Sequence, residues 1–384
     1  MRIPKWLVIA SLLLLFFYLV SLLVRLSIPS TTGPHAVGRE RVIWIDGARP
    51  ESHTSDPADS RTVPIQVWYP AQPGTGQPAE YLEDLDVIGE GMRASGEFGW
   101  LELMGLRLVR DRALDGAAVA ADRDGFPVLI LSPGNLTNVA FYASLAEDLA
   151  SRGYVVVGVD HPYQVAAVMV ADRSVAVYDH SMDVQLGSVG PKIEERVADI
   201  RFVLDQIRGG ADGIEFLAPS LDLGKVAVLG HSNGGLAAVE MCRQDPELAA
   251  CVNIDGQNAG GPFGHEVDSV APDQPFMYLT KETSIHDEIN RRFETAGEGP
   301  VRAVIPDAAH GDFTDGGLFE PELDPLAGNA RSVAMTSRSL VGTFLDHWLV
   351  QPRSRPFSGL DLRSDVYINV YPLDDNPPIP TDFG

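Results

Sequence analysis

The sequence around Ser232 constrains the fold of this chain more than any other stretch. Residues 230–235 read Gly-His-Ser-Asn-Gly-Gly; they close an apolar run at 225–229 and open a small-residue run with helical spacing at 236–240. Glycines on both sides of a serine let a strand and a helix pass closely, with the serine exposed on a strained turn. The bare motif also occurs in ordinary turns, but this strand–turn–helix setting predicts that Ser232 is a nucleophile.

Apolar stretches and helical patterns alternate on both sides of this turn. Strands are predicted at 41–45, 63–69, 128–132, 154–159, 225–229, 250–254, 275–279 and 301–305, and helices at 139–152, 192–208 and 331–350. Near-continuous apolar strands separated by helices indicate a mainly parallel sheet that is covered on both faces. We therefore predict an α/β fold, in which 41–45 and 63–69 pair as edge strands at the start of the sheet.

The remaining segments are assigned by composition. We assign 26–40 to a linker, 41–352 to the α/β domain and 353–384 to an irregular tail with a proline-rich end. Within the domain, 79–122 is predicted to be a mostly helical, apolar insertion. Such an insertion packs on the core, covers a substrate pocket or meets lipid, and its sequence leaves these three roles open.

Residues 6–24 carry the one clear membrane signal in the sequence. These nineteen residues have no charge, and as a helix they would span about 29 Å, close to the thickness of the hydrocarbon core. Arg2 and Lys5 precede them, which favours a cytoplasmic start and an exported body. We predict a transmembrane anchor at 1–25, with a cleaved signal peptide and a secreted protein as the alternative.

The chain is strongly acidic, with 53 acidic and 29 basic residues and a formal net charge of −24. This balance argues against nucleic acid, and against anionic lipid, as an electrostatic partner. Adaptation to high salt and genome composition are both open explanations for it. The sequence has no clustered His, Cys or Asp with metal-binding spacing, so we predict neither a metal nor an organic cofactor.

His310 is the best candidate for the base that a serine nucleophile needs. A serine hydroxyl reacts when an imidazole accepts its proton, and in a hydrolase of this kind the base and its carboxylate both follow the serine along the chain. His310 follows a predicted strand in a loop of small residues. His286 and His265 are the alternatives. His231 lies within the motif itself, with its side chain expected on the side of the turn away from the nucleophile.

Asp255 is the best candidate for the carboxylate that orients this base. It ends the strand predicted at 250–254, directly after the helix that follows the serine. Glu282, after the strand at 275–279, remains the alternative. Asp307 and Asp312 are too close in sequence to His310 to orient it easily through the far nitrogen of its ring.

Two backbone N–H groups are expected to stabilise the oxyanion that forms during attack. One belongs to Asn233, the residue after the nucleophile. The other should come from the loop after the strand at 128–132, with the sequence Ser-Pro-Gly-Asn-Leu. Because proline has no N–H, Asn135 is the expected second donor.

The chain has two cysteines, Cys242 and Cys251. An exported location would permit a disulfide between them. We expect Cys242 on the helix after Ser232 and Cys251 in the next strand, both buried and unpaired.

Six short motifs follow one another in a specific order: Val67-Trp68-Tyr69-Pro70, Leu131-Ser132-Pro133-Gly134, Val159-Asp160-His161, Gly230-His231-Ser232-Asn233-Gly234-Gly235, Asn253-Ile254-Asp255-Gly256 and Ala309-His310-Gly311-Asp312-Phe313. This order resembles that of the plasma-type (isoform II) platelet-activating-factor acetylhydrolases and their bacterial relatives, over about residues 40–350. The resemblance implies an α/β-hydrolase with the triad Ser232, Asp255 and His310. It also implies backbone donors at Asn135 and Asn233 and calcium-independent ester hydrolysis.

The resemblance weakens at two positions that would line the pocket. The family often has histidine where Pro133 stands and an aromatic residue where Asn233 stands. We therefore predict a serine esterase that forms an acyl-enzyme, acting on short-chain or oxidised-acyl phospholipid esters or on small soluble esters. Cutinase-type polyester hydrolysis and a non-catalytic binding module with a hydrolase fold are the alternatives.

Overall fold

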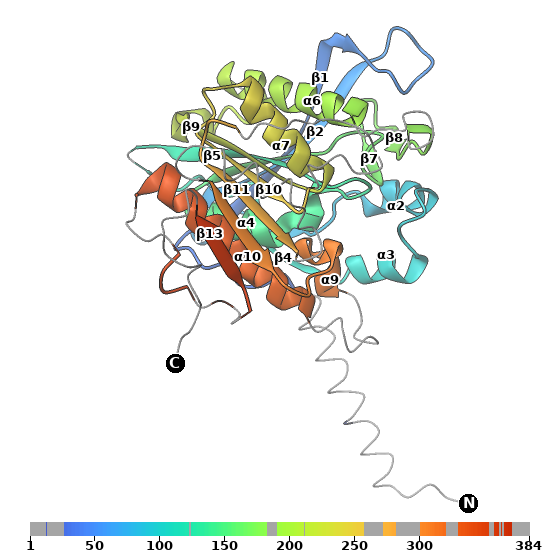
Figure 1. Ribbon diagram of the computed structural model, residues 1–384. Helices are drawn as coiled ribbons and strands as arrows, with labels where there is room; N and C mark the ends of the chain where they lie inside the picture. Colours follow the sequence, from blue (N-terminus) through green and yellow to red (C-terminus); the bar gives the residue numbers. More distant parts are fainter. Residues whose placement is uncertain are drawn as a thin grey trace, which may run out of the picture.

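The computed structural model describes residues 13, 27–122, 124–182, 190–210, 212–256, 272–281, 300–319, 329–352, 357–360, 362 and 365–370. Within these residues, eleven strands form one sheet in the spatial order β13-β12-β11-β10-β9-β5-β6-β2-β1-β4-β3 (Figure 1). The two short strands β7 and β8 pair separately.

The strands are β1 (Ala36–Pro50), β2 (Ser60–Ala71), β3 (Gln77–Glu80), β4 (Arg110–Asp115), β5 (Phe126–Ser132), β6 (Val155–Val159), β7 (Ala167–Met169), β8 (Val175–Val177), β9 (Leu221–His231), β10 (Ala250–Ile254), β11 (Phe276–Lys281), β12 (Val301–Ile305) and β13 (Tyr367–Val370). The α-helices are α2 (Leu85–Ala94), α3 (Trp100–Leu106), α4 (Ala143–Ser151), α6 (Gly190–Arg208), α7 (Asn233–Gln244), α9 (Gly316–Phe319) and α10 (Ala330–Leu345). Short 3₁₀ turns lie at η1 (Val139–Tyr142), η2 (Ala218–Ser220) and η4 (His310–Phe313), and the π-helical turn η6 (Asp346–Val350) continues α10.

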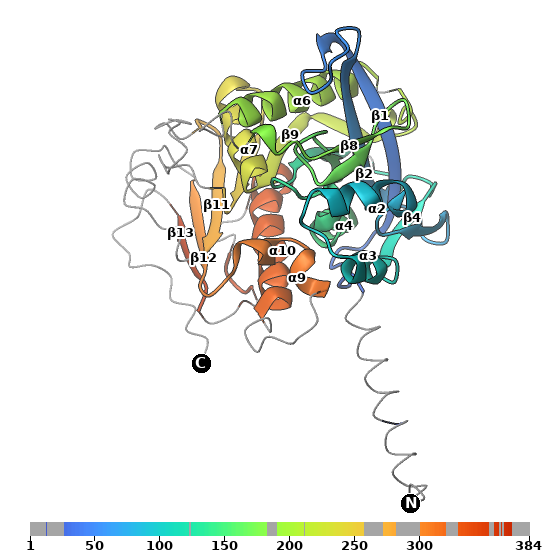
Figure 2. The same cartoon turned by 90° about the vertical axis from the view of Figure 1, so that its right-hand side faces the viewer.

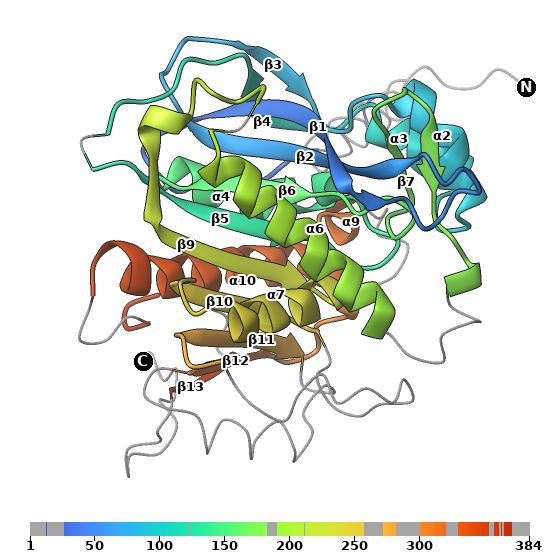
Figure 3. The same cartoon turned by 90° about the horizontal axis from the view of Figure 1, so that it is seen from above.

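The centre of the sheet is parallel and buried. Strands β6, β5, β9, β10, β11 and β12 pair in parallel, each with its neighbour. Helices α6 and α7 cover one face and α4 and α10 the other (Figures 1 and 3), and each pair packs its apolar side chains into a separate core cluster. The predicted mainly parallel sheet with helices on both faces is therefore confirmed. Parallel strands place their carboxyl ends along one edge, where ligands of such sheets bind.

The sheet extends further at both ends than the sequence analysis proposed. β1 and β2 do pair, antiparallel, but β4 and β3 lie beyond β1 and form the true edge. β1 begins at Ala36, so residues 36–40 belong to the sheet and not to a linker. At the opposite edge, β13 from the supposedly irregular tail pairs antiparallel with β12.

Residues before β1 also pack on the domain. Ile28 is buried, the Thr32 N–H donates to Asp148 Oδ1 at 2.7 Å, and the Arg338 guanidinium donates to the Ser30 carbonyl at 2.8 Å. The linker expected at 26–40 is thus part of the folded body over its described residues. Ordinary polar residues in this stretch gave no signal of those long-range contacts.

The insertion at 79–122 is less helical than expected. It contains α2, which packs against β7 and β8, and α3, which lies next to α2 (Figure 2), but also β4 and the end of β3. Ala71 and Val119 form an isolated bridge, which ties the end of the insertion back to β2. The segment therefore widens the sheet as well as covering it.

The membrane segment predicted at 6–24 lies outside the described residues, apart from Leu13. Among the residues that the structure does describe, none belongs to a helix that is both long enough and apolar enough to cross a bilayer.

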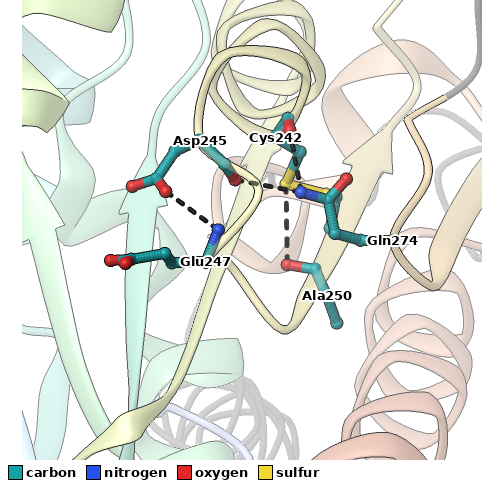
Figure 4. Close-up of a disulfide and its surroundings, with 6 residues drawn as sticks. Cys242, Asp245, Glu247, Ala250 and Gln274 are labelled. Carbon is teal, nitrogen blue, oxygen red and sulfur yellow. Dashed lines mark hydrogen bonds between the residues drawn. A yellow bond between two sulfur atoms is a disulfide. The ribbon is translucent and has the colours of Figure 1, made fainter.

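Cys242 and Cys251 form a disulfide, so the expectation that they are unpaired is wrong (Figure 4). Their positions on α7 and β10 are as predicted, and their Cα atoms lie 6.5 Å apart, within bridging distance. Gln274 holds the intervening turn, because its side-chain amide donates to the carbonyls of Cys242 and Asp245 at 2.9 Å each. The helix that begins after Ser232 is thus linked covalently to the strand that ends before Asp255.

Candidate active site

Ser232 occupies a strained turn between β9 and α7. Its backbone has φ 54° and ψ −123°, a region that residues with a side chain rarely adopt. Its N–H donates to the Ile254 carbonyl at 2.9 Å, which ties the turn to β10. A Cβ on Gly230 would overlap the Gly234 backbone, and one on Gly234 would overlap the Ser132 carbonyl. The glycines of the motif are therefore required for strand, turn and helix to pass this closely.

Asp255 and His310 are in direct contact at the same edge of the sheet. In the parallel pairing of β9 and β10, His231 lies opposite Ile254, so Ser232 and Asp255 leave their strands side by side. His310 stands in η4, after β12, and its Nδ1 lies 2.6 Å from Asp255 Oδ2. The Asp255 side chain is fully buried, whereas 44% of the His310 side chain is exposed.

The surroundings of Asp255 keep its carboxylate available to His310. Its Oδ1 accepts a hydrogen bond from the Thr280 hydroxyl at 2.9 Å, and the Lys281 ammonium lies 3.8 Å from its Oδ2. Within the described part of the chain, neither the Ser232 hydroxyl nor His310 Nε2 forms a hydrogen bond. Catalytic hydrogen bonds are often long before substrate binds.

His231 is buried next to His310, and not turned away from the site as the sequence analysis expected. Its ring centroid lies 4.5 Å from that of His310, and its Nδ1 accepts a hydrogen bond from the Tyr142 hydroxyl at 2.8 Å. Burial, with a further contribution from the charge on His310, lowers the pKa of His231 to about 3. His231 is therefore a neutral packing surface for the His310 ring.

The loop after β5 lies against the Ser232 turn. A Cβ on Gly134 would lie 3.4 Å from the Ser232 Cβ, and the Gly134 N–H donates to the Tyr142 hydroxyl at 2.9 Å. The N–H groups of Asn135 and of Asn233, at the start of α7, donate to no group of the described chain. The first N–H groups of a helix lack partners within it, so they suit an anionic oxygen.

A second Ser–His–Asp arrangement lies behind this loop, and the sequence analysis missed it. Ser132 Oγ lies 2.9 Å from His161 Nε2, and His161 Nδ1 lies 2.9 Å from Asp199 Oδ2. All three residues are fully buried. Burial lowers the pKa of His161 to about 4. The motif Val159-Asp160-His161 at the end of β6 is visible in the sequence, but no sequence pattern connects it to Ser132 or Asp199.

The other residues considered for the carboxylate and the base are either not described by the structure or placed away from these roles. Glu282, His286 and His265 lie outside the described residues. Asp312 Oδ2 accepts the Ala309 N–H at 2.8 Å, so it caps the turn that carries His310 instead of orienting the ring. Asp307 forms no contact with His310 among the interactions of the described residues. No set of three or more His, Cys, Asp or Glu in these residues is arranged to hold a metal ion.

A strained serine turn at the carboxyl edge of a mainly parallel, doubly covered sheet defines an α/β-hydrolase. Residues 23–289 match the family model described as platelet-activating factor acetylhydrolase, isoform II. The chain belongs to this family.

Individual relatives agree with this assignment. The chain is 27% identical to a probable 1-alkyl-2-acetylglycerophosphocholine esterase from Arthroderma benhamiae, over 55% of this chain and 53% of that protein, about half its length. It is 23% identical to platelet-activating factor acetylhydrolase from Cavia porcellus, over 92% of this chain and 83% of that one. A ferulic acid esterase from Streptomyces cinnamoneus superposes with a TM-score of 0.70 at 26% identity, covering 88% of this chain and 98% of that one. The relatives are thus named for the hydrolysis of carboxylic esters.

Proposed function

We propose that this protein is a serine carboxylic ester hydrolase that works through an acyl-enzyme. Ser232 is the nucleophile, His310 the general base and later the general acid, and Asp255 the carboxylate that orients His310. The 2.6 Å contact between His310 Nδ1 and Asp255 Oδ2, at the sheet edge where Ser232 turns, is the main support. With Nδ1 donating to Asp255, the ring presents an unprotonated Nε2 for the serine proton.

The reaction follows from these positions. Ser232 Oγ attacks the ester carbonyl as His310 Nε2 takes its proton, and the oxyanion is stabilised by the N–H groups of Asn135 and Asn233. His310 then gives the proton to the leaving alcohol. A water molecule, deprotonated by the same ring, hydrolyses the acyl-enzyme and frees Ser232.

We propose esters with short or oxidised acyl chains, in phospholipids or small soluble molecules, as the substrates. The names of the two curated relatives support the lipid ester. The structural neighbour acts on ferulic acid esters, which makes small aromatic esters the second candidate. A series of p-nitrophenyl esters of increasing acyl length, with p-nitrophenyl ferulate, separates these classes: a steep preference for acetate supports the first. Comparable hydrolysis of long chains or of polyester films would favour a lipase or cutinase activity instead.

Variants of the three residues test the mechanism on the same esters. Ser232→Ala, His310→Ala and Asp255→Asn should each lose most of kcat. Asp307→Asn is the matched control for Asp255→Asn, because both aspartates have positive φ, at 59° and 48°, and asparagine tolerates this conformation. Ester hydrolysis at the wild-type level in Ser232→Ala would refute the mechanism. A large loss in Glu282→Gln with little in Asp255→Asn would move the acid to Glu282.

We also propose that the domain is exported and works at a lipid surface. Three features support this: the uncharged run at 6–24, the Cys242–Cys251 disulfide typical of oxidising compartments, and an exposed apolar surface on and after α3. On that surface Trp100 is 61% exposed and Leu101 75%, and Met104 and Leu108 are also exposed. Ser27 forms an isolated β-bridge with Arg110, which follows these exposed residues in the chain. The segment that follows the apolar run therefore joins the domain close to this surface.

Vesicle binding tests the lipid surface directly. The wild-type domain should co-sediment with phosphatidylcholine vesicles, and the Trp100→Ser/Leu101→Ser variant should lose most of this binding while hydrolysing soluble acetate esters normally. Equal binding by wild type and variant would refute the proposed surface. Protease accessibility of the domain on intact cells tests export.

A further inference from the structure

A buried arginine contacts backbone carbonyls in the loop after β5, which carries the expected oxyanion donor Asn135. The Arg196 guanidinium, on α6, donates to the Pro133 carbonyl at 2.7 Å, to the Gly134 carbonyl at 3.4 Å and to Ser132 Oγ at 3.4 Å. Its Nε donates to Gln164 Oε1 at 2.7 Å. The planar guanidinium therefore contacts three consecutive residues: Ser132, which ends β5, and Pro133 and Gly134 of the loop that follows.

These contacts set the direction of the Asn135 N–H. The Gly134 carbonyl and the Asn135 N–H belong to one planar trans peptide unit, so the two groups point in opposite directions. A carbonyl that faces Arg196 leaves the N–H facing away from Arg196. The loop meets the Ser232 turn at Gly134, whose added Cβ would lie 3.4 Å from the Ser232 Cβ.

The other polar groups of the loop are also fixed. The Gly134 N–H is bound to Tyr142, and the Leu136 N–H donates to the Gln164 carbonyl at 2.9 Å. Ser132 Oγ is bound to His161, which is itself bound to Asp199. The Asn135 N–H is thus the one main-chain donor of residues 134–136 that has no partner among the described residues.

Arg196 also contributes its charge. Its side chain is fully buried, and no carboxylate of the described chain lies within ion-pair distance of it. Burial lowers the pKa of Arg196 to about 10, so the group stays charged at neutral pH. A cation on the carbonyl oxygen of a peptide polarises it and strengthens the N–H as a donor, because chains of hydrogen bonds reinforce one another in a low-dielectric interior.

We propose that Arg196 is the positioning residue of the oxyanion site, holding the Pro133 and Gly134 carbonyls so that the Asn135 N–H is aimed at the oxyanion beside Ser232. Arg196 does not touch the reacting atoms, and it acts through the Gly134–Asn135 peptide. This inference rests on the proposed ester hydrolysis by Ser232.

The test compares an ordinary ester with its thiono counterpart. Wild type, Arg196→Lys, Arg196→Gln and the control Arg338→Lys hydrolyse p-nitrophenyl acetate and the thiono ester in which sulfur replaces the carbonyl oxygen. Sulfur accepts hydrogen bonds weakly, so the ratio of the two kcat/KM values reports the oxyanion donors. Both substrates are measured on one preparation, so partial unfolding leaves this ratio unchanged.

In Arg196→Gln the ratio should fall by about 10- to 100-fold, through kcat and with KM nearly unchanged, since loss of one oxyanion donor costs about 10²- to 10³-fold. Arg196→Lys keeps the positive charge but lacks the several N–H donors of the guanidinium, so its ratio should fall less. Arg338 is a matched control because it is also buried, on α10, and donates to the Ser30 carbonyl and to Asp148 away from the site. Arg338→Lys should keep the wild-type ratio.

A wild-type ratio in both Arg196 variants would overturn the inference while leaving the esterase proposal intact. A wild type that hydrolyses neither substrate would overturn both. If neither Arg196 variant folds, Ser132→Ala decides, because it removes one acceptor of Arg196 and should lower the ratio about two- to fivefold, the value of about one hydrogen bond. An unchanged ratio in folded Ser132→Ala would then refute the positioning role.

Discussion

Two Ser–His–Asp arrangements border the loop after β5, and they differ in their exposure to solvent. In Ser232, His310 and Asp255 the histidine–carboxylate distance is 2.6 Å, and in Ser132, His161 and Asp199 it is 2.9 Å. The first histidine is 44% exposed and the second fully buried. Geometry between the three residues is therefore a poor guide to catalysis unless access is considered with it.

The two arrangements also differ in their charges. Asp199 is held by Arg61 at 2.8 Å and by Arg49 at 2.7 Å. Burial would raise the pKa of Asp199, but the charge of Arg61 and the hydrogen bond with His161 lower it below its usual value. A carboxylate neutralised in this way offers little stabilisation to an imidazolium. The Lys281 ammonium lies 3.8 Å from Asp255 Oδ2, a longer distance than either arginine contact of Asp199.

The largest expected effect is a loss of kcat that distinguishes Ser232 from Ser132. Ser232→Ala should lower kcat by about 10⁴- to 10⁶-fold, as when a triad nucleophile is removed. Ser132→Ala should stay within about tenfold of wild type. Hydrolysis of p-nitrophenyl acetate by the purified variants measures both, with thermal unfolding as the control for folding. Comparable losses in the two variants would show that the buried serine takes part in the chemistry.

The two aspartates should separate activity from stability. Asp255→Asn should lose about 10⁴-fold in kcat, because asparagine favours the wrong tautomer of His310. Its stability should change little, since His310 and Lys281 are partly exposed and can be solvated. Asp199→Asn should instead lose about 3–5 kcal/mol in free energy of unfolding, because it breaks the buried ion pair with Arg61 at 2.8 Å, whose other carboxylates, Glu195 and Glu51, lie farther away at 3.1 and 3.2 Å.

Urea unfolding and steady-state kinetics on both aspartate variants give these four values. The distinction between the two arrangements fails if Asp199→Asn loses kcat as strongly as Asp255→Asn at unchanged stability.

The sequence was sufficient to predict the elements whose signals are local. The glycines around Ser232 predicted the turn, and apolar runs predicted the parallel strands. The chain order of the triad, the positions of Asp255 and His310 directly after predicted strands, and the family resemblance led to these two residues, which the structure places in contact. The roles of these residues, and of Asn135 and Asn233 as donors, remain predictions.

The features that were missed depend on distances through space. Cys242 and Cys251 pair because α7 and β10 pack closely, which no local pattern reports. The hydrogen bonds of His161 reach 29 residues back to Ser132 and 38 forward to Asp199. His161 precedes Ser232, so the rule that the base follows the serine in the sequence also excluded it as a candidate base. Arg196 lies in a helix whose apolar spacing predicted the helix but not the loop it holds.

The buried histidine should make stability depend on pH. The pKa of His161 is about 4 in the folded protein and about 6.5 when unfolded. As pH falls from 6.5 to 4 the unfolded chain takes up a proton that the folded chain refuses, so folding loses about 3 kcal/mol through this group. Urea unfolding at several pH values gives the free energy of unfolding of wild type and of His161→Gln. The amount by which wild type exceeds the variant should shrink as pH falls.

The comparison with His161→Gln is needed because other groups titrate in this range. Burial raises the pKa of Asp160 to about 6 and of Asp315 to about 7. Both carboxyls stabilise the fold as pH falls, opposite in sign to His161, and both are common to wild type and variant. A difference that stays constant from pH 7 to pH 4 would show that His161 is not held neutral by burial.

The smallest expected effect is the stability change in Ser132→Ala. The Ser132 hydroxyl is the partner of His161 Nε2, and its loss leaves a buried acceptor without a hydrogen bond. Such a loss costs about 1–3 kcal/mol, which urea unfolding can resolve. Ser232→Ala serves as the control, because the Ser232 hydroxyl has no partner among the described residues and its removal should leave stability nearly unchanged. If Ser132→Ala is as stable as wild type, the buried hydroxyl does not hold the loop, and the two arrangements differ in access alone.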